Sequence, residues 1–371
     1  MSARGASNGV AFSEADRAFM RRALFTAERG RGRTSPNPIV GAVVVSPDGI
    51  VLGQGAHLEA GGPHAEVHAL AEAGDRARGA TLYCTLEPCA HVGRTPPCAP
   101  RVAEAGASRA VVAMTDPNPR VAGEGIALLR ARGVRVDVGL CGDEAARANA
   151  AFLTWMTKRR PHVTLKIARS HDGFVGRPDM SVKLTGAAMD RLMHRQRAEV
   201  DAIAIGAGTL LADDPVLTPR GAFRARPLTR VVFDWRLRGG GDRRLYRTLD
   251  AGPVLIVTTE AAAAANAQTA RDLQDRGVEL FALPQRDLAR AMTALGDLSI
   301  TSLLVEGGPG LQDAFAAAHL VDRVQTIVVP RTLGAGVAAP RLLELEGKLA
   351  PPREEHAGGD TLLEADVHGL D

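Results

Sequence analysis

The chain has 371 residues, of which 45% are hydrophobic and 23% charged, and its formal net charge is +3. This length and composition suit a globular protein of two domains. The chain lacks the dense basic runs of a nucleic-acid-binding protein, and its aromatic content of 4% gives little support for a base-stacking platform. No stretch reaches the roughly 18 apolar residues of a membrane span. We therefore expect neither nucleic acid nor membrane as a partner.

The amino-terminal residues 1–12 are small and polar, which predicts a disordered segment without the apolar core of a secretion signal. The chain has four cysteines, Cys84, Cys89, Cys98 and Cys141. In a chain of this length without a secretion signal, we expect them to be reduced thiols or metal ligands and not a disulfide framework. These features together predict a cytoplasmic protein.

The first half of the chain alternates helix and strand patterns. Ser13 is a candidate N-cap for a helix that ends near Gly30. The apolar face of that helix would carry Ala15, Phe19, Ala23 and Ala27. The elements expected next are a strand at 39–45, a return strand from 50, a helix at 64–73, a strand at 81–86, a helix at 98–105, a strand at 109–114, a helix at 124–132 and a strand at 134–138. This order predicts an αβα layered domain over residues 13–150.

A second alternating pattern begins near His162, after a connecting helix and a linker that we place at 151–161. Its strands are expected at 162–168, 200–205, 230–233, 254–258, 302–305 and 324–329. The alanine-rich segment 261–270 predicts a surface helix. Residues 162–371 therefore predict a second α/β domain. Because no G-x-G-x-x-G follows a strand, a Rossmann dinucleotide domain is not expected.

Three candidate zinc ligands occur in the first half. His64 belongs to the segment Pro63-His64-Ala65-Glu66, and Cys89 and Cys98 each follow a proline. One imidazole and two thiolates suit zinc, and three protein ligands leave a fourth position for water, as in catalytic sites. His64 and Cys98 stand at the starts of expected helices, whose positive amino termini favour thiolate.

Glu66 lies two residues after His64, close to the expected metal but not required as a ligand. A carboxylate there can take a proton from zinc-activated water and deliver it to a ring nitrogen and a leaving amine. The order H-x-E, then P-C, is a signature of zinc-dependent deaminases, although here eight residues separate the two cysteines and not two. The alternative is a structural zinc site or a set of unrelated polar residues.

Three further histidines have less definite interpretations. His68 is one helical turn beyond His64, and it is better explained as a packed or solvated residue than as a ligand. For His57 and His91, the sequence leaves substrate contact and an ordinary place in the cleft wall equally open.

The segment Thr85–Cys98, with the sequence TLEPCAHVGRTPPC, closely resembles the bifunctional pyrimidine deaminase–reductases of riboflavin biosynthesis. Residues 35–41 and 116–119 resemble the substrate loops of that family, which implies that Asn37 contacts substrate. The resemblance extends over nearly the whole chain after residue 13. It implies a cytidine-deaminase-like αβα domain followed by a dihydrofolate-reductase-like α/β domain.

In the second half, several segments are similar to the reductase domain of this family, namely 201–203, 206–215, 217–220, 226–227, 230–234 and 321–322, and the similarity supports a functional role for the glycine-rich turn at 305–310. Carried over by position, the similarity implies cofactor contacts at Lys183, Thr209, Asp213, Glu306, Gly307 and Gly308. It implies substrate contacts at Ser181, Arg197, Leu217 and Arg220. A glycine-rich strand-to-helix turn can expose N–H groups to phosphate, and guanidinium groups can bind a ribosyl phosphate bidentately.

The resemblance implies a specific pair of reactions. The substrate would be 2,5-diamino-6-(5-phosphoribosylamino)pyrimidin-4-one, deaminated hydrolytically at a Zn²⁺ site. NADPH would then reduce the ribosyl group to give 5-amino-6-(5-phosphoribitylamino)uracil. The implied partner is thus a small phosphoribosyl-pyrimidine, and the family also implies a homodimer through the reductase domain.

Two positions depart from the family pattern. His171 stands where the family usually has leucine, and Lys183 stands where it usually has a tryptophan beside the cofactor. A flexible cation removes a flat stacking surface, although it could add a phosphate contact. A deaminase with an inactive or altered reductase therefore remains an alternative to the bifunctional enzyme. A non-enzymatic binding protein with a structural zinc is the third hypothesis.

Overall fold

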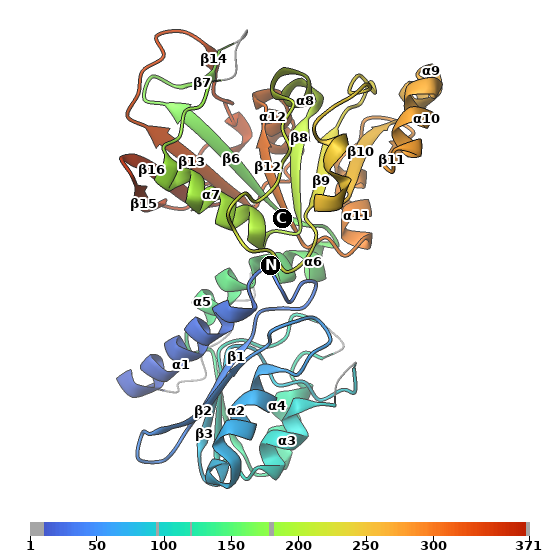
Figure 1. The fold of residues 1–371 in the computed structure, drawn as a ribbon. Coiled ribbons are helices and arrows are strands. Elements are labelled where there is room, and N and C mark those ends of the chain that lie inside the picture. The colour runs from blue at the N-terminus through green and yellow to red at the C-terminus, as the bar shows by residue number, and fades with distance from the viewer. Residues whose placement is uncertain (1–10, 94–95, 119–120, 178–181, 369–371) are drawn as a thin grey trace. The chain divides into compact units, whose positions relative to one another are not determined.

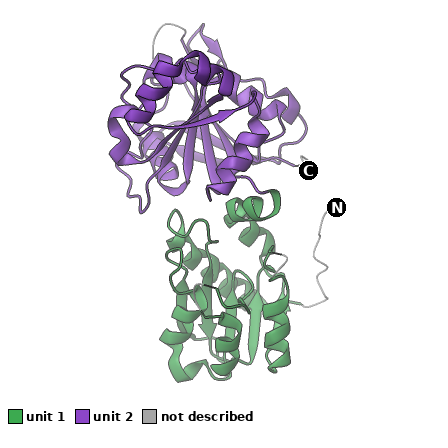
Figure 2. Ribbon diagram, turned by 90° about the vertical axis from the view of Figure 1, so that its right-hand side faces the viewer, with its two compact units in different colours: residues 1–158 green, residues 159–371 purple. Residues whose placement is uncertain are grey.

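The computed structural model describes residues 11–93, 96–118, 121–177 and 182–368. The chain forms two compact units that divide between Lys158 and Arg159, as Figures 1 and 2 show. This division falls inside the segment 151–161 that the sequence assigned to a linker, and most of that segment is helical. Of the segment 1–12 that the sequence predicts to be disordered, residues 1–10 lie outside the described residues, whereas Phe12 packs against an apolar cluster of the first unit.

The first unit is a five-stranded sheet between two helical layers. Its strands are β1 (Gly41–Val45), β2 (Val51–Ala56), β3 (Thr81–Cys84), β4 (Arg109–Val112) and β5 (Arg135–Val138). Its helices are α1 (Glu14–Ala27), η1 (Glu28–Gly30), α2 (Ala65–Ala73), η2 (Gly74–Ala77), α3 (Cys98–Glu104), α4 (Glu124–Ala131), α5 (Gly142–Ala148) and α6 (Ala150–Lys158). The strand order is β2-β1-β3-β4-β5, antiparallel from β2 to β3 and parallel from β3 to β5. Helices α2, α3 and α4 cover one face, and α1 and α5 cover the other, which confirms the αβα prediction.

Helix α1 begins with a capping box between Ser13 and Asp16 and ends close to the predicted place. Its predicted apolar face is partly wrong, because Ala15 is exposed and Asp16 is buried. The buried side of α1 consists of Asp16, Met20, Ala23, Thr26 and Ala27. Asp16 lies inside because the hydroxyl of Tyr83 donates to it at 2.8 Å and the guanidinium of Arg109 at 2.7 Å.

The second unit is built on a nine-stranded sheet. Its strands are β6 (His162–Ser170), β8 (Ala202–Gly206), β9 (Thr229–Phe233), β10 (Val254–Thr259), β11 (Glu279–Leu283), β12 (Ser302–Gly307), β13 (Arg323–Val329), β15 (Arg353–Ala357) and β16 (Asp360–Asp366), and β7 (Phe174–Gly176) pairs separately with β14 (Val337–Ala338). The order is β11-β10-β9-β8-β12-β6-β13-β16-β15. Strands β11 to β13 in this order are parallel, and β16 and β15 are antiparallel additions. The carboxyl ends of the parallel strands therefore share one edge, where ligand sites of open α/β sheets occur.

Helices cover both faces of this sheet. They are α7 (Ala187–Glu199), α8 (Ala207–Asp213), η3 (Tyr246–Ala251), α9 (Glu260–Ala265), α10 (Ala267–Asp275), α11 (Leu288–Asp297), α12 (Pro309–Ala317) and η4 (Leu343–Leu345). Helices α11 and α12 pack on one face, and α7, α8 and α10 pack on the other. The alanine-rich segment is two helices and not one, because α9 ends at Asn266, whose side-chain amide donates to the Ala262 carbonyl at 2.9 Å.

The six strands predicted in the second unit are present, whereas β7, β11, β14, β15 and β16 were not predicted. Strands β15 and β16 carry charged side chains that pair with one another, such as Arg353 with Glu364 and Asp366. Their sequences therefore lack a regular alternation of apolar and polar residues.

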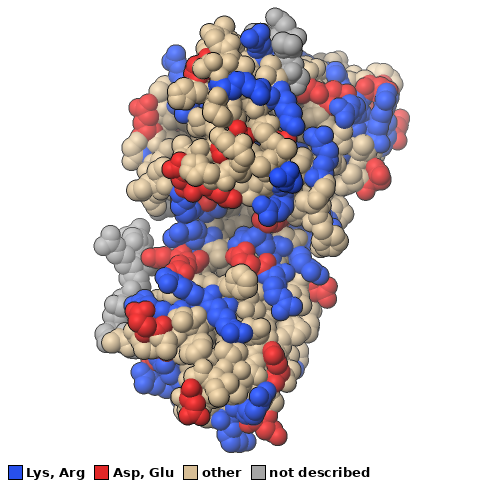
Figure 3. Space-filling model, turned by 60° about the vertical axis from the view of Figure 1, so that its left-hand side comes forward, with Lys and Arg blue, Asp and Glu red and all other residues tan. Residues whose placement is uncertain are grey.

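Figure 3 shows Lys and Arg side chains interspersed with Asp and Glu on the visible face of each unit. Among the described residues, no helix is both long enough and apolar enough to cross a membrane.

We predict that Asp16→Asn lowers the free energy of unfolding of the first unit by about 3 kcal/mol, because it removes a buried charge partner of Arg109. The Asp16 side chain is 8% exposed, and among the described residues the variant leaves Arg109 with Asp137 as its one counter-charge. Urea denaturation would measure the loss. Glu14→Gln, an exposed change in the same helical turn, is the control.

The effect of Asp16 should also depend on pH. Burial raises the pKa of Asp16, but hydrogen bonds from Arg109, Ser13 and Tyr83 outweigh it and lower the pKa to about 2. The stabilisation is then complete above the unfolded-state pKa of about 4 and is lost as the pH falls towards 2. The stability difference between wild type and Asp16→Asn should shrink over this interval. A pH-independent difference would show that packing alone is responsible.

Candidate active sites

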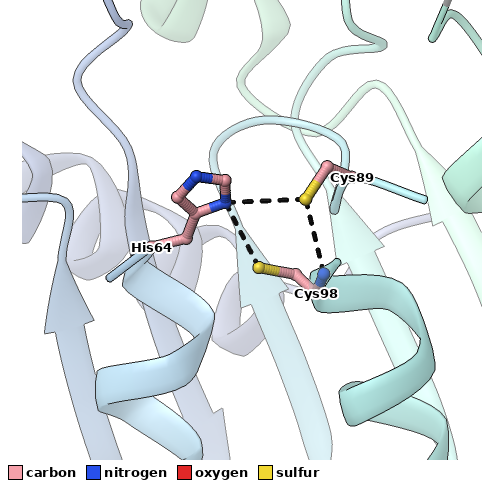
Figure 4. A group of neighbouring side chains, drawn as sticks. All are labelled: His64, Cys89 and Cys98. Carbon is pink, nitrogen blue, oxygen red and sulfur yellow. Dashed lines mark hydrogen bonds between the residues drawn. The ribbon is translucent and has the colours of Figure 1, made fainter. Parts of the chain in front are cut away.

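His64, Cys89 and Cys98 converge in the first unit (Figure 4). The Nδ1 atom of His64 lies 3.5 Å from the Sγ of Cys89 and 3.3 Å from the Sγ of Cys98. A tetrahedral zinc with a Zn–N distance of about 2.0 Å and a Zn–S distance of about 2.3 Å separates such atoms by about 3.5 Å. The three residues therefore already have the spacing that a bound zinc requires.

Two helix starts and one loop bring these ligands together. His64 is the N-cap of α2 and Cys98 is the first residue of α3, so both predicted placements are confirmed. Cys89 follows β3, and the backbone N–H of Cys98 donates to its Sγ at 3.3 Å. Hydrogen bonds from the Cys98 thiol, from His64 and from this N–H outweigh burial and lower the pKa of Cys89 to about 4. Cys89 is therefore the cysteine held as a thiolate, whereas a hydrogen bond to Cys89 and burial raise the pKa of Cys98.

Glu66 lies in the first turn of α2 and is 3% exposed. Its Oε2 atom has no hydrogen-bond partner among the described residues. Burial raises the pKa of Glu66 to about 7, and a nearby zinc ion would favour its carboxylate form. A buried carboxyl group with one uncommitted oxygen beside three metal ligands can accept and release a proton.

A cavity of about 390 Å³ is lined by two of the three candidate zinc ligands, His64 and Cys89. Its polar lining includes Glu66, Asn37, His57, His91 and Asp116, and α6 supplies an apolar wall of Phe152, Trp155 and Met156. The sequence left the roles of His57 and His91 open, and the structure places both in this lining.

His57 fixes the amide of Asn37. The His57 Nδ1 atom lies 3.1 Å from the carbonyl oxygen of Pro63, and its Nε2 lies 3.2 Å from the Asn37 Nδ2. Because only a protonated Nδ1 can donate to a carbonyl, Nε2 accepts from the Asn37 amide. Burial lowers the pKa of His57, which keeps this imidazole neutral. The orientation of Asn37 in the cavity wall is therefore set by a buried neighbour.

Glu87 is a site residue that the sequence analysis missed. Its buried carboxylate accepts hydrogen bonds at 2.9–3.2 Å from four backbone N–H groups, those of Asp116, Gly123, Gly125 and Ile126. These bonds hold the segment between β4 and α4 next to the segment that contains Cys89. The first of these segments carries Asp116 and Asn118, which line the cavity. The only signal in the sequence was that Glu87 stands two residues before Cys89. A glutamate at that position does not by itself indicate that its carboxylate binds four backbone N–H groups.

The second unit contains a cavity of about 620 Å³ at the carboxyl ends of β6, β8 and β12. All six residues expected to contact the cofactor line it, namely Lys183, Thr209, Asp213, Glu306, Gly307 and Gly308. The pairing of β12 with β8 shifts register between Val305 and Gly307, at the position of Glu306. Gly308 is the N-cap of α12, and Pro309, the first helical residue, has no N–H. Because the N–H groups of Leu311 and Gln312 donate to the Gly308 carbonyl at 3.0 and 3.2 Å, Gly310 is the residue of this turn whose N–H can serve a ligand at the cavity.

Glu306 forms a bidentate ion pair with Arg197. The Nε atom of Arg197 lies 2.7 Å from Oε1 and its Nη2 lies 2.5 Å from Oε2, and the two side chains are 15% and 7% exposed. Burial raises the pKa of Glu306, but the charges of Arg197 and Lys166 outweigh burial and lower the pKa to about 2. Glu306 is therefore a fixed anion at the cavity wall, in contrast to Glu66.

Of the residues expected to bind the substrate of the second unit, Arg197, Leu217 and Arg220 are not part of this cavity lining. Leu217 is buried in an apolar cluster with a φ of 59°, and Arg220 is exposed. Ser181 lies outside the described residues. Of the two departures from the family pattern, His171 is exposed and absent from the lining, whereas Lys183 belongs to it. The Nζ atom of Lys183 pairs with Asp190 at 2.7 Å.

Family models match both units. The model described as the cytidine and deoxycytidylate deaminase zinc-binding region matches residues 13–114, and the model of the RibD C-terminal domain matches residues 161–362. The riboflavin biosynthesis protein RibD of Aquifex aeolicus is 37% identical over 355 residues, which cover 94% of this chain and 98% of that protein. The protein of the same name from Escherichia coli is 38% identical over 361 residues, with the same two coverages of 94% and 98%.

Solved structures agree with these matches over the whole chain. RibD of Acinetobacter baumannii superposes with a TM-score of 0.84 at 34% identity, and covers 96% of this chain and 99% of its own. A Thermotoga maritima protein, titled a diaminohydroxyphosphoribosylaminopyrimidine deaminase/5-amino-6-(5-phosphoribosylamino)uracil reductase, gives a TM-score of 0.83 at 32% identity, with coverages of 95% and 99%.

We predict that His64→Ala reduces bound zinc from about one ion per chain to near none, because two thiolates alone do not complete a three-ligand site. Metal analysis of purified protein measures this directly and does not depend on activity. His68→Ala, one helical turn further along α2, is the matched control and should keep its zinc. Zinc retained by His64→Ala would exclude the proposed ligand set.

We predict that Glu87→Gln speeds amide hydrogen exchange at Gly123, Gly125 and Ile126 by about ten- to a hundredfold. The reason is that an amide group cannot accept all four N–H groups that the carboxylate accepts. Glu72→Gln, which alters an exposed carboxylate that accepts only from the backbone of Gln54 at 2.8 Å, is the control. Unchanged exchange would mean that Glu87 does not hold this segment.

Proposed function

The chain belongs to the RibD family of riboflavin biosynthesis, and we propose from this premise which of its residues carry out the two reactions. Members of the family are bifunctional deaminase–reductases, and this chain has both the zinc-binding deaminase domain and the reductase domain. The proposed substrate is 2,5-diamino-6-(5-phosphoribosylamino)pyrimidin-4-one. The first unit deaminates it, and the second reduces the ribosyl group of the product to give 5-amino-6-(5-phosphoribitylamino)uracil.

The observation that carries the deaminase proposal is the uncommitted oxygen of Glu66 beside three correctly spaced zinc ligands. A zinc ion held by His64, Cys89 and Cys98 supplies a Lewis acid that makes hydroxide available near neutral pH. Glu66 takes one proton from the attacking water and passes it to the ring nitrogen, and it then transfers the proton of the added hydroxyl group to the amine. The C–N bond to the 2-amino group breaks, ammonia leaves, and a carbonyl remains at that carbon.

The remaining lining of this cavity binds and encloses the ring. Asn37, whose amide is held by His57, presents a polar group to the pyrimidine edge. The side chains of Phe152, Trp155 and Met156 supply the apolar surface against which a flat ring packs.

The reductase proposal rests on the convergence of the six expected cofactor residues on one cavity. NADPH, when bound there, supplies the hydride. The glycine turn before α12 gives phosphate groups a close approach to backbone N–H groups. Thr209 and Asp213, on α8, line the same cavity, and the Thr209 hydroxyl lies beside Gly307 and Gly308. Glu306, paired with Arg197, supplies a charged group between cofactor and substrate. Ser181, Leu217 and Arg220 remain proposals for contacts to the ribosyl phosphate.

One observation favours the alternative of an altered reductase. Lys183, which stands where related sequences usually have tryptophan, lies in the cavity lining and is tied to Asp190. His171 gives this alternative no support, because its side chain is exposed and is not part of the lining. We favour the bifunctional enzyme, because the other five residues expected to contact the cofactor line the same cavity.

We also propose that the protein works in the cytoplasm, because a site with two zinc thiolates requires reduced cysteines, and all four cysteines are free thiols. A homodimer through the second unit stays a prediction from the family.

We predict that Glu66→Gln lowers the kcat of ammonia release by about 10²–10⁴-fold, because the proton carrier is lost. Zinc content should stay near that of the wild type. Oxidation of NADPH on the deaminated intermediate, supplied separately, should also be unchanged, which shows that the second unit is intact. Normal ammonia release by folded, zinc-loaded Glu66→Gln would refute the mechanism.

We predict that the wild-type chain oxidises one NADPH for each ammonia released. We also predict that Lys183→Trp changes the affinity for NADPH by about tenfold or less. Stopped-flow absorbance of the reduced cofactor measures the amount of NADPH oxidised and, as its concentration is varied, the affinity of the variant for it. Asp190→Asn, which removes the ion pair but leaves Lys183, is the companion variant. If only Lys183→Trp turns over NADPH, the altered-reductase alternative is correct.

A further inference from the structure

Asn149 joins two walls of the cavity in the first unit, although it is not itself part of the lining. The residue lies at the junction of α5 and α6 and is 4% exposed. Its side-chain Oδ1 accepts the N–H of Ile39 at 2.9 Å, and its Nδ2 donates to the Ile39 carbonyl at 3.0 Å. Two hydrogen bonds therefore connect one buried side-chain amide to one residue that is 110 positions away in the chain.

The orientation of this amide follows from the chemistry of its partners. A peptide carbonyl accepts and a peptide N–H donates, so Nδ2 has to face the Ile39 carbonyl and Oδ1 has to face the Ile39 N–H. The Asn149 Nδ2 also donates to the Ala145 carbonyl at 3.4 Å, within the preceding helix. Only an amide of this length supplies a donor and an acceptor at these two places, so the residue type is specific to the contact.

The contact with Ile39 matters because the loop before it has few other donors. Within the segment 36–39, positions 36 and 38 are prolines without an N–H, so Asn37 and Ile39 supply the only backbone donors. The Asn37 N–H donates to the Thr34 carbonyl at 2.9 Å and closes a turn on one side. The Ile39 N–H is bound by Asn149 on the other side. The backbone of Asn37, which lines the cavity, is thus held at both ends.

Asn149 also precedes the helix that forms the apolar wall of this cavity. The Leu153 N–H donates to the Asn149 carbonyl at 2.9 Å, which ties the residue to the first turn of α6. Phe152 and Met156 are three and seven positions further on, so they lie on the same face of the helix as Asn149. Both of them line the cavity. The two bonds to Ile39 therefore fix the separation between this face of α6 and the loop of Asn37.

We propose that Asn149 is a positioning residue of the deaminase that acts on the substrate through Asn37. It sets the width of the cavity, so that the Asn37 amide reaches the edge of the pyrimidine while the ring packs on α6. His57 and Asn149 have complementary roles, because His57 holds the side-chain amide of Asn37 and Asn149 holds the backbone beside it. The inference rests on the proposed deaminase function and adds to it a residue that contacts neither the zinc ligands nor the substrate.

The test replaces Asn149 in the full zinc-loaded chain. Asn149→Asp keeps the size and one acceptor oxygen, but it places a second oxygen against the Ile39 carbonyl. We expect the KM for the diaminopyrimidine to rise about tenfold or more, while the kcat of ammonia release stays within about threefold. Asn149→Ala, which removes both bonds to Ile39, should act in the same direction. Thr154→Val is the control, because it alters a buried polar residue of α6 outside the lining and should leave the KM unchanged.

A double-mutant cycle separates positioning from a general loss of stability. If Asn149 acts through Asn37, then Asn149→Asp should raise the KM by less than about twofold once Asn37→Ala is present. The full effect of Asn149→Asp in that background would overturn the inference. So would a fall in kcat at an unchanged KM. Loss of bound zinc from Asn149→Asp would overturn it as well, because the residue would then support the whole site and not the loop of Asn37.

Substrate affinity can also be measured without turnover. The chain has two tryptophans, Trp155 and Trp235, and Trp155 lines the cavity. In Glu66→Gln/Trp235→Phe protein, the emission of Trp155 should be quenched by bound substrate that is deaminated too slowly to disturb the titration. Adding Asn149→Asp to this protein should raise the Kd about tenfold, and an unchanged Kd would contradict the inference.

One measurement needs no substitution at Asn149. In the wild-type chain, the Ile39 amide should exchange with solvent at least about a hundredfold more slowly than an unprotected peptide. Fast exchange would show that the bond to Asn149 is not kept in solution, and it would overturn the inference. These failures are distinguishable from a failure of the proposed deaminase. If the wild type releases no ammonia, the deaminase proposal fails. If it does and Asn149→Asp has the same KM, only the role of Asn149 is refuted.

Discussion

Two helix starts have to meet at one point for the first unit to hold a zinc ion. Helix α2 follows His64 and helix α3 starts at Cys98, and both pack on the same face of the sheet. The close approach of α2 depends on β2, because a Cβ at Gly55 would lie 2.3 Å from the carbonyl oxygen of Ala65. Any larger residue at Gly55 would push His64 and Glu66 away from the cysteines. The deaminase chemistry therefore depends on a packing contact as much as on the ligands.

The two units use buried carboxylates for opposite purposes. Burial raises the pKa of Glu66 and leaves it one uncommitted oxygen, as a proton carrier requires. The charges of Arg197 and Lys166 lower the pKa of Glu306, so this group stays an anion throughout a catalytic cycle. Glu87 is a third case, in which four N–H groups use the carboxylate as a structural tie. The same residue type thus has three roles, and its neighbours decide which one applies.

The sequence predicted the features that local patterns encode. The two helix starts, the αβα layers and six strands of the second sheet follow from spacing and periodicity, and the structure contains all of them. It also brings His64, Cys89 and Cys98 together, and their role as zinc ligands stays a prediction. Features that depend on distant partners were missed. Asp16 is buried only because Tyr83 and Arg109 reach it across the sheet. The cavity at the carboxyl ends of β8 and β9 joins Trp235 and Arg286 from separate loops, and no local pattern connects them.

The most direct test of the account is a single incubation of the zinc-loaded chain with the diaminopyrimidine ribosyl phosphate, in which ammonia and the absorbance of NADPH are followed together. The account predicts ammonia release with or without NADPH, and oxidation of one NADPH per ammonia that begins only after ammonia has appeared. Oxidation of NADPH without ammonia release, or the absence of both signals, would contradict the assignment of the first unit as the deaminase that acts before the reductase.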